Sequence, residues 1–415
     1  MKKTVIWVLA ALTLLCCARM QTFDSGPKDK KESRVAMGFG VYLPQTKAGS
    51  AGEMNDAKLK ATGFGVFAFE QAGGYDASIK PNFMYNQLVE WKTSKWTYEP
   101  VKYWPNQLAD DGATDGQGAS SEEAHMVSFF AYAPYVEEAG GTEGITAMSA
   151  GSLPGDPTVT YKVSEDLNKN VDLVWGTSNG AVWTNVAGGD NTVEIGLPYI
   201  DLQKPKNGTN VNFRFYHALA QLNLTAVSSY NVVGAGGTAK DGVKITIKEV
   251  KLTVPGMYDQ GVLNLNNTEA KTPLWDFSAA KDSTLTLVVS GDKLHTNVLD
   301  AGDKEASAQP AGVTATEGPV LATNKYFTLL PREVSTNVTV KVTYYVTTDD
   351  PGLDDGYSRV ENAISKTITF PNGFRYGTKN SIKMILGLSE VGLTGVVADW
   401  ETNEPIDVNL PQNAD

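Results

Sequence analysis

Cysteine is nearly absent from this sequence. The only two, Cys16 and Cys17, stand side by side near the amino terminus, at the end of an apolar run. The residues that follow therefore form neither a disulfide nor a thiolate metal site. The folded part of the chain must be held together by the burial of apolar side chains.

Histidine is almost as rare, with His125, His217 and His295 in three separate contexts. The sequence contains no phosphate-binding loop, HExxH motif or dinucleotide-binding fingerprint. Serine and aspartate are so common that a catalytic triad could be assembled anywhere, so their spacing carries no information. The sequence thus predicts a protein that is not an enzyme and needs no cofactor. An enzyme would need His125 or His217 in a cleft beside a carboxylate.

An excess of basic residues is also missing. The 35 lysines and arginines are outnumbered by 47 aspartates and glutamates, for a net charge of -12, which argues against a nucleic-acid partner. The acidic segment TDDPGLDDGY, residues 348 to 357, lacks the alternate spacing and the distal glutamate of a calcium loop. It is interpreted as a solvated turn, as is the segment from 108 to 116, and no metal site is predicted.

Long apolar runs are missing except at the start, where two lysines precede residues 5 to 15, VIWVLAALTLL. At about 1.5 Å per residue this run is too short to cross a bilayer core of about 30 Å, and it is typical of a signal peptide. Leu14 and the small Cys16 before Cys17 resemble a lipobox, which predicts a lipoprotein signal peptide over residues 1–16 and lipidation of Cys17. Cys16 is the poorer candidate because bulky Leu15 precedes it, and ordinary signal-peptidase cleavage is the alternative.

The chain beyond the signal peptide is dominated by β signals. Residues 17–34 are polar and lysine-rich, which predicts a flexible tether. From Val35 onward, short runs of β-branched and aromatic residues alternate with clusters of Gly, Asn, Asp and Pro. These runs include residues 63–70, 88–100, 125–135 and 171–176, and the second is predicted to form a hairpin that turns near Thr93 and Ser94.

Two segments show the period of a strand most clearly. In NVTVKVTYYVTT, residues 337 to 348, apolar side chains fall on one face and polar ones on the other, although Tyr345 joins the polar face. In GVKITIKEVKLTV, residues 242 to 254, the alternation slips by one between Ile247 and Val250, which predicts a β-bulge.

The predicted fold is all-β, because no segment shows a convincing helical stripe. About 400 residues remain after processing, too many for one typical core, so two antiparallel β-sandwich domains are expected. A polar segment with Pro and Gly at residues 202–210 places the boundary near residue 208, with domains at 35–208 and 209–415.

The segment WTYEPVKYWPNQ, residues 96 to 107, gathers four aromatic rings. Sugar-binding platforms expose their rings, whereas strands of a disulfide-free sandwich bury them. Trp96 and Tyr98 are two residues apart in an extended run, so they are predicted to pack in the core. Tyr103 and Trp104 are predicted to pack over a domain edge, with a glycan platform as the alternative.

Six segments occur in an order that resembles a known family: TGFGVFAFE, WTYEPVKYWP, SFFAYAPY, VDLVWG, FRFYHALAQLNLTA and LGLSEVGLTGVVADWE. From about residue 35 to its end, the chain resembles the fimbrillin family, the type V pilins and Mfa-like proteins of Bacteroidales. The resemblance implies two tandem transthyretin-like β-sandwich domains and export as a lipoprotein to the outer membrane and cell surface. It also implies assembly with other fimbrial subunits by strand exchange.

In the scheme that the resemblance implies, an arginine-specific protease removes an N-terminal strand, and a neighbour's strand fills the open groove. The corresponding strand here is VAMGFGVYLP, residues 35 to 44. The chain departs from the scheme because no arginine follows this strand closely. Arg34 precedes it and Lys47 is the next basic residue, so these two are the candidate processing sites.

The C-terminal segment EPIDVNLP is a candidate donor strand. Ile406, Val408 and Leu410 alternate with polar residues and could fill a neighbour's groove. Alternatively, the segment forms a last strand that pairs within its own domain.

The predicted function is a non-enzymatic structural, accessory or anchor subunit of a surface fimbria, with host or bacterial surface ligands as further partners. The alternative is a glycan-binding cell-surface lipoprotein, which would show at least two exposed and roughly coplanar rings on one face.

Overall fold

The structure, a computed structural model, describes residues 35–43, 53–105, 125–138, 140–180, 182–184, 190–203, 210–228, 243–278, 282–291, 318–321, 325–387, 391–399 and 405–408. The chain divides into Met1–Val35 and Ala36–Asp415, and the description below concerns the second unit. Five of the predicted site residues, Cys16, Cys17, Arg34, Lys47 and Leu410, lie outside the described residues.

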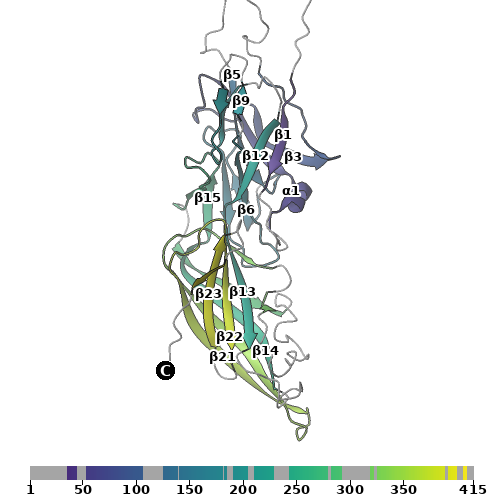
Figure 1. The fold of residues 1–415 in the computed structure, drawn as a ribbon, viewed down its shortest axis with the longest axis vertical. Helices are drawn as coiled ribbons and strands as arrows, with labels where there is room; N and C mark the ends of the chain where they lie inside the picture. Colours follow the sequence, from purple (N-terminus) through teal and green to yellow (C-terminus); the bar gives the residue numbers. More distant parts are fainter. Residues whose placement is uncertain are drawn as a thin grey trace, which may run out of the picture. The chain divides into compact units, whose positions relative to one another are not determined.

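The described residues are almost entirely β, as the sequence predicts (Figure 1). Their one α-helix, α1 (Asp56–Thr62), begins where the side chain of Asn55 accepts a hydrogen bond of 2.8 Å from the Lys58 N–H, and ends at Gly63. In the part of the chain that the structure describes, no helix is long and apolar enough to cross a membrane.

The first sheet joins eight of the described strands in the order β1–β12–β8–β5–β2–β3–β4, with β11 beside β5. β1 and β4 are its two edges. The bounds are β1 (Gly38–Tyr42), β12 (Asn210–His217), β8 (Val174–Ser178), β5 (His125–Ala133), β2 (Phe64–Ala72), β3 (Met84–Lys92), β4 (Lys95–Thr97) and β11 (Tyr199–Leu202).

The central strands β2 and β5 are buried on both faces, which explains why their sequences are continuously apolar rather than alternating. On one face, Phe64 and Phe129 meet the ring of Phe39 from β1. On the other face, Phe67 and Phe130 join the main hydrophobic cluster of the chain. The sheet therefore separates two apolar layers.

A second sheet has the order β16–β15–β7–β6, with bounds β16 (Leu274–Asp276), β15 (Gln260–Asn264), β7 (Thr158–Lys162) and β6 (Gly144–Met148). Strand pairing thus crosses residue 208, because β15 pairs with β7 and β12 pairs with β8. The division into domains at 35–208 and 209–415 stays a prediction. A small separate ribbon consists of β9 (Val182–Thr184) and β10 (Asp190–Thr192).

Two further sheets carry the C-terminal strands, of which β13, β22 and β23 lie side by side (Figure 1). One runs β18–β13–β22–β23–β24, with β19 beside β13, and the other runs β17–β14–β20–β21. The bounds are β18 (Gly318–Pro319), β13 (Ala220–Ser228), β22 (Thr378–Leu386), β23 (Val391–Asp399), β24 (Pro405–Val408), β19 (Phe327–Leu329), β17 (Asp282–Ser290), β14 (Val243–Tyr258), β20 (Thr336–Asp349) and β21 (Tyr357–Phe370).

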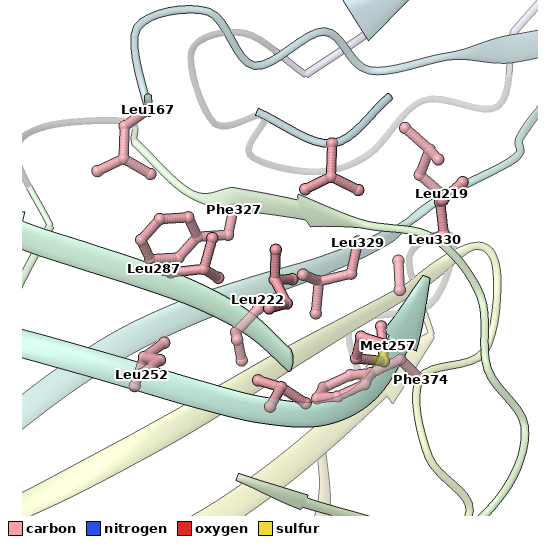
Figure 2. Close-up of a cluster of buried hydrophobic side chains, with 14 of the residues drawn as sticks. Leu167, Leu219, Leu222, Leu252, Met257, Leu287, Phe327, Leu329, Leu330 and Phe374 are labelled. Carbon is pink, nitrogen blue, oxygen red and sulfur yellow. The ribbon is translucent and has the colours of Figure 1, made fainter. Parts of the chain in front are cut away.

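Side chains from both C-terminal sheets meet in one buried cluster. Figure 2 shows Leu222 and Leu329 of one sheet with Leu252 and Leu287 of the other, and all four are buried. The two sheets therefore pack as the layers of a β-sandwich. The more specific transthyretin-like topology stays a prediction.

Three local predictions are confirmed. On β20, the buried face is confirmed, since Val338, Val340, Val342 and Tyr344 are at most 1% exposed, but Thr343 and Thr347 of the predicted wet face are buried as well. The pairing of β14 with β20 shifts register between Ile247 and Glu249, where the sequence predicts a bulge. Thr93 and Ser94 connect β3 to β4.

The prediction of purely antiparallel sheets is wrong at two places. β1 pairs with β12 in parallel, and β13 pairs with β22 in parallel, while every other pair between described strands is antiparallel. Parallel neighbours need long connections instead of tight hairpins, so no local turn signal marks them in the sequence.

Candidate functional site

The candidate functional site is β1 together with the groove that holds it. β1 lies at the edge of the first sheet, and its one partner among the described strands is β12. Phe39 of β1 stands opposite Val211 of β12. A Cβ atom on Gly40 would lie 2.1 Å from the Oδ1 atom of Asn212. A larger residue at this position would therefore require the Asn212 side chain to move.

Phe39 is the buried centre of this site. Its ring centroid lies 5.1 Å from that of Tyr98, 6.0 Å from Phe213, 6.2 Å from Phe129 and 6.3 Å from Phe64. These four rings come from different parts of the first sheet and its flanking segment, and three of the contacts are edge-to-face. Because a phenylalanine buries roughly 150–250 Å², this side chain accounts for much of the apolar contact between β1 and the groove.

The segment that follows β4 holds the start of β1 from the side opposite β12. The Tyr98 hydroxyl donates a hydrogen bond of 3.1 Å to the carbonyl oxygen of Met37. The Met37 N–H donates one of 2.9 Å to the carbonyl oxygen of Lys102, and Ala36 forms an isolated bridge with Tyr103. Burial raises the pKa of Tyr98, which keeps this hydroxyl protonated as a donor.

The aromatic segment, residues 96 to 107, buries two of its four rings. Tyr98 is 5% exposed and Trp104 is 4% exposed, so both rings are buried, while Tyr103 is 44% exposed. Trp96 is only half-buried, which corrects the expectation that it packs fully in the core. It stands opposite Trp91 on β3, and their rings lie 5.3 Å apart.

A groove of about 550 Å³ runs beside β1. Apolar side chains line much of it, with polar groups of the hairpin between β3 and β4 at its rim; the lining includes Met37, Phe39, Trp96, Tyr98 and Val101. β1 is therefore bordered by a groove that apolar and polar side chains line together.

The predicted donor segment is described only in its backbone. β24 pairs with β23 in the antiparallel direction, with Ile406 opposite Val397 and Val408 opposite Gly395. Leu410 lies outside the described residues. A donor role for Ile406, Val408 and Leu410 stays a prediction.

Two histidines lie beside carboxylates. His125, at the start of β5, contacts Glu70, and both side chains reach the surface. His217, at the end of β12, has its Nδ1 atom 3.0 Å from the Oδ2 atom of Asp172. The same oxygen accepts a hydrogen bond of 2.7 Å from the Met54 N–H.

An enzyme is expected to have a histidine in a cleft beside a carboxylate, and His217 with Asp172 meets the second part of that condition. The side chain of His217 is 4% exposed and that of Asp172 is 0% exposed. A small cavity borders His217, but its lining includes no serine, threonine or cysteine, so no hydroxyl or thiol nucleophile of the triad type stands there. Among the described residues, no group of three or more His, Cys, Asp or Glu side chains could hold a metal ion.

Comparisons with known proteins agree on one group. Residues 120–400 match a family described as Fimbrillin-like. The chain is 25% identical over 434 aligned positions to the fimbrium subunit Fim1C of Phocaeicola vulgatus, covering 98% of this chain and 99% of that protein. It shares its fold with a fimbrial protein from Bacteroides vulgatus solved by crystallography, at a TM-score of 0.57 and 20% identity, covering 88% of this chain and 99% of the other.

Proposed function

The chain belongs to the fimbrillin-like family, and from this premise we propose that it is a component of a cell-surface fimbria that joins its neighbours by exchange of β-strands. Its partners are other fimbrial subunits. The similarity to the fimbrium subunit Fim1C over nearly the whole of both chains supports this assignment.

The observation that carries strand exchange is the way β1 is held. It is an edge strand with one partner among the described strands, and its Phe39 ring packs among the rings of Phe64, Tyr98, Phe129 and Phe213. Removal of β1 would leave the outer edge of β12 unpaired and would expose the rings around Phe39. A strand from a neighbouring subunit can satisfy both needs, because its backbone pairs with β12 and its alternate apolar side chains replace Phe39.

The C-terminal segment is the proposed donor. Its residues Ile406, Val408 and Leu410 are spaced by two, as a strand that inserts side chains into a groove requires. In the single chain, β24 is an edge strand beside β23 and has no second partner among the described strands. It can therefore leave with the loss of one strand pairing.

Two roles within a fimbria remain as alternatives, and they differ in the mature amino terminus. A lipidated product that keeps β1 would begin at Cys17, with Cys16 as the less favoured site, and would act as an anchor or accessory subunit in the outer membrane. A stalk subunit would begin after Lys47, which removes β1, or after Arg34, which leaves β1 in the chain to be displaced from β12 by the neighbour's strand. N-terminal sequencing of the protein from the cell surface separates them, because a start at Cys17 excludes the stalk role and a start near residue 35 or 48 excludes the anchor role.

We propose no catalytic activity and no cofactor for this chain. The partner of His217 is a buried aspartate that also accepts a backbone N–H, an arrangement that supports a structural role. Replacing Asp172 with asparagine should therefore lower the free energy of unfolding but leave fimbrial assembly of the folded protein unchanged.

A reversible lock tests strand exchange. In the variant Tyr42→Cys/Arg214→Cys, the two positions are register partners on β1 and β12, about 5 Å apart as neighbouring strands are, so a disulfide can join them. We expect the oxidised variant to remain unassembled and to assemble after reduction. The matched control Lys251→Cys/Lys341→Cys joins β14 to β20, which need not separate, and should assemble in both states. Equal assembly of the locked variant and the control would exclude release of β1.

A further inference from the structure

A second cavity, of about 230 Å³, lies where three distant parts of the chain meet. Its walls come from the end of β12, the loop between β15 and β16, and the turn before β22 together with the end of β23. Its lining includes Tyr216, His217, Lys271, Arg375, Tyr376 and Asp399. The volume is below the range of about 300–1,000 Å³ that is usual for drug-sized ligands, so a ligand with one ring is the expected size.

The charges around this cavity favour an anion. Lys271 and Arg375 supply two positive charges, while Asp399 supplies one negative charge. The Nη2 atom of Arg375 is 3.9 Å from the Oδ1 atom of Asp399, and both side chains are more than half exposed, so this ion pair is weak. Lys271 makes no ion pair with any described residue. A carboxylate ligand could therefore interact with Lys271, which has no ion-pair partner among the described residues, and with Arg375, whose ion pair with Asp399 is weak.

Lys271, which lines the cavity, has an unusual backbone conformation. Lys271 has a φ of 62°, a backbone conformation that few residues other than glycine and asparagine adopt. The conformation is held by a hydrogen bond of 2.8 Å from the Lys271 N–H to the carbonyl oxygen of Gly196. A Cβ atom on Gly196 would lie 2.5 Å from the Lys271 Cγ atom, so the lysine stem lies directly over this glycine. Such strained positions concentrate at functional sites.

Two phenol rings complete the cavity. Tyr216 is buried, and its ring packs 5.7 Å from the ring of Trp175. The Tyr376 hydroxyl donates a hydrogen bond of 3.4 Å to the Oγ1 atom of Thr272, which ties this ring to the loop that carries Lys271. Aromatic faces pack well against the C–H faces of a pyranose, and guanidinium and ammonium groups bind carboxylates by charge-assisted hydrogen bonds.

We propose that this cavity binds a pyranose that carries a carboxylate, a sugar of the hexuronate class. The carboxylate lies between Lys271 and Arg375, and the sugar ring lies against Tyr376 and Tyr216. This site is separate from β1 and its groove, and it would give a fimbrial component a means to recognise acidic glycans.

The test is a calorimetric titration of the full-length protein with three ligands: glucuronate, glucose and acetate. We expect binding of glucuronate and no measurable binding of glucose or acetate, because the site needs both the charge and the ring. In the variant Lys271→Asn, which keeps a residue tolerant of positive φ, glucuronate should bind about tenfold more weakly or worse. Arg375→Gln should weaken binding in the same direction.

The matched control is Lys341→Gln, an exposed lysine on β20 that does not line the cavity, and its affinity for glucuronate should equal that of the unaltered protein. Three results would overturn the proposal: no binding of glucuronate, equal binding of glucose or acetate, or an equal loss in Lys341→Gln and Lys271→Asn. Fimbrial assembly of Lys271→Asn should be normal, so a failure of this site is distinguishable from a failure of strand exchange.

Discussion

The hydroxyl of Tyr98 donates a hydrogen bond of 3.1 Å to the carbonyl oxygen of Met37. This contact joins the first strand to a segment about sixty residues later in the sequence, and the hydroxyl also lies 3.2 Å from the Lys102 N–H, which donates to it. One buried phenol therefore organises both the flanking segment and the strand that this segment holds.

Replacing Tyr98 with phenylalanine should loosen β1 without unfolding the protein. The ring remains to pack on Phe39, but the hydrogen bonds to Met37 and Lys102 are lost, at a cost of about 1 kcal/mol. Hydrogen exchange of the Met37 and Phe39 amides should become roughly fivefold faster. Tyr103→Phe is the control because that hydroxyl belongs to an exposed ring, and equal acceleration in both variants would contradict the role given to Tyr98.

Replacing Phe39 with alanine should have a larger effect on the same strand. The change empties the centre of a cage of four rings, and comparable core substitutions cost about 3–5 kcal/mol. Limited proteolysis should cut within β1 or just after it, while the amides of β20 keep their protection. Tyr42→Ala removes an exposed ring from the same strand and should change little. If β1 and β20 lost protection together in Phe39→Ala, β1 would not be a separable unit.

Stability should fall at alkaline pH through the buried tyrosines. Burial raises the pKa of Tyr199 to about 12, whereas a tyrosine in the unfolded chain titrates near 10. A raised folded-state pKa contributes stability in full below about pH 10 and loses it as the pH rises towards 12, at about 1.4 kcal/mol per pH unit. Urea unfolding at several pH values should therefore show a smaller decline for Tyr199→Phe than for the unaltered protein, and parallel curves would contradict this assignment.

The turn between β3 and β4 should accept stabilising substitutions. Thr93 and Ser94 have φ values of 48° and 71°, the pair of signs that a type I′ turn requires. Thr93→Asn with Ser94→Gly should raise the free energy of unfolding by about 0.5–1 kcal/mol, because these residues adopt positive φ with little strain. Ser94→Ala should lower it. Thermal unfolding measures both, and an unchanged melting temperature in the Asn-Gly variant would show that the turn is not strained.

This turn also illustrates what the sequence could predict. A hairpin near Thr93 and Ser94, the one-sided alternation of β20 and the slip after Ile247 all depend on residues close together in the chain. Local periodicity and turn composition are sufficient for such features.

The remaining features depend on contacts between distant residues, which leave no local pattern. The parallel pairing of β1 with β12 is one case, because nothing within residues 35 to 44 indicates which strand β1 pairs with. The half-buried state of Trp96 is another, because the burial of this ring depends on its contacts with Trp91 across the hairpin and with Phe64. The buried pair of His217 and Asp172 likewise cannot be predicted from the spacing of residues in the sequence, and neither can the cavity beside Lys271.

A final prediction concerns the ion pair between Glu53 and Lys379. The Nζ atom of Lys379 on β22 lies 3.1 Å from the Oε1 atom of Glu53, whose side chain is 0% exposed. Lys379→Gln should lower the free energy of unfolding by about 3 kcal/mol, because it removes a cation that lies beside a buried carboxylate. Glu53→Gln/Lys379→Gln should recover part of that loss, since the neutral pair carries no uncompensated charge.

The matched control for this pair is Lys248→Gln, which breaks an ion pair of 2.9 Å with Glu361 between two surface side chains. Water and salt screen that pair, so little change in stability is expected. Urea unfolding of all three variants measures these changes in the free energy of unfolding. If Lys248→Gln and Lys379→Gln cost the same, or if the double variant is no more stable than Lys379→Gln alone, burial does not set the strength of the pair that joins Glu53 to the C-terminal sheet.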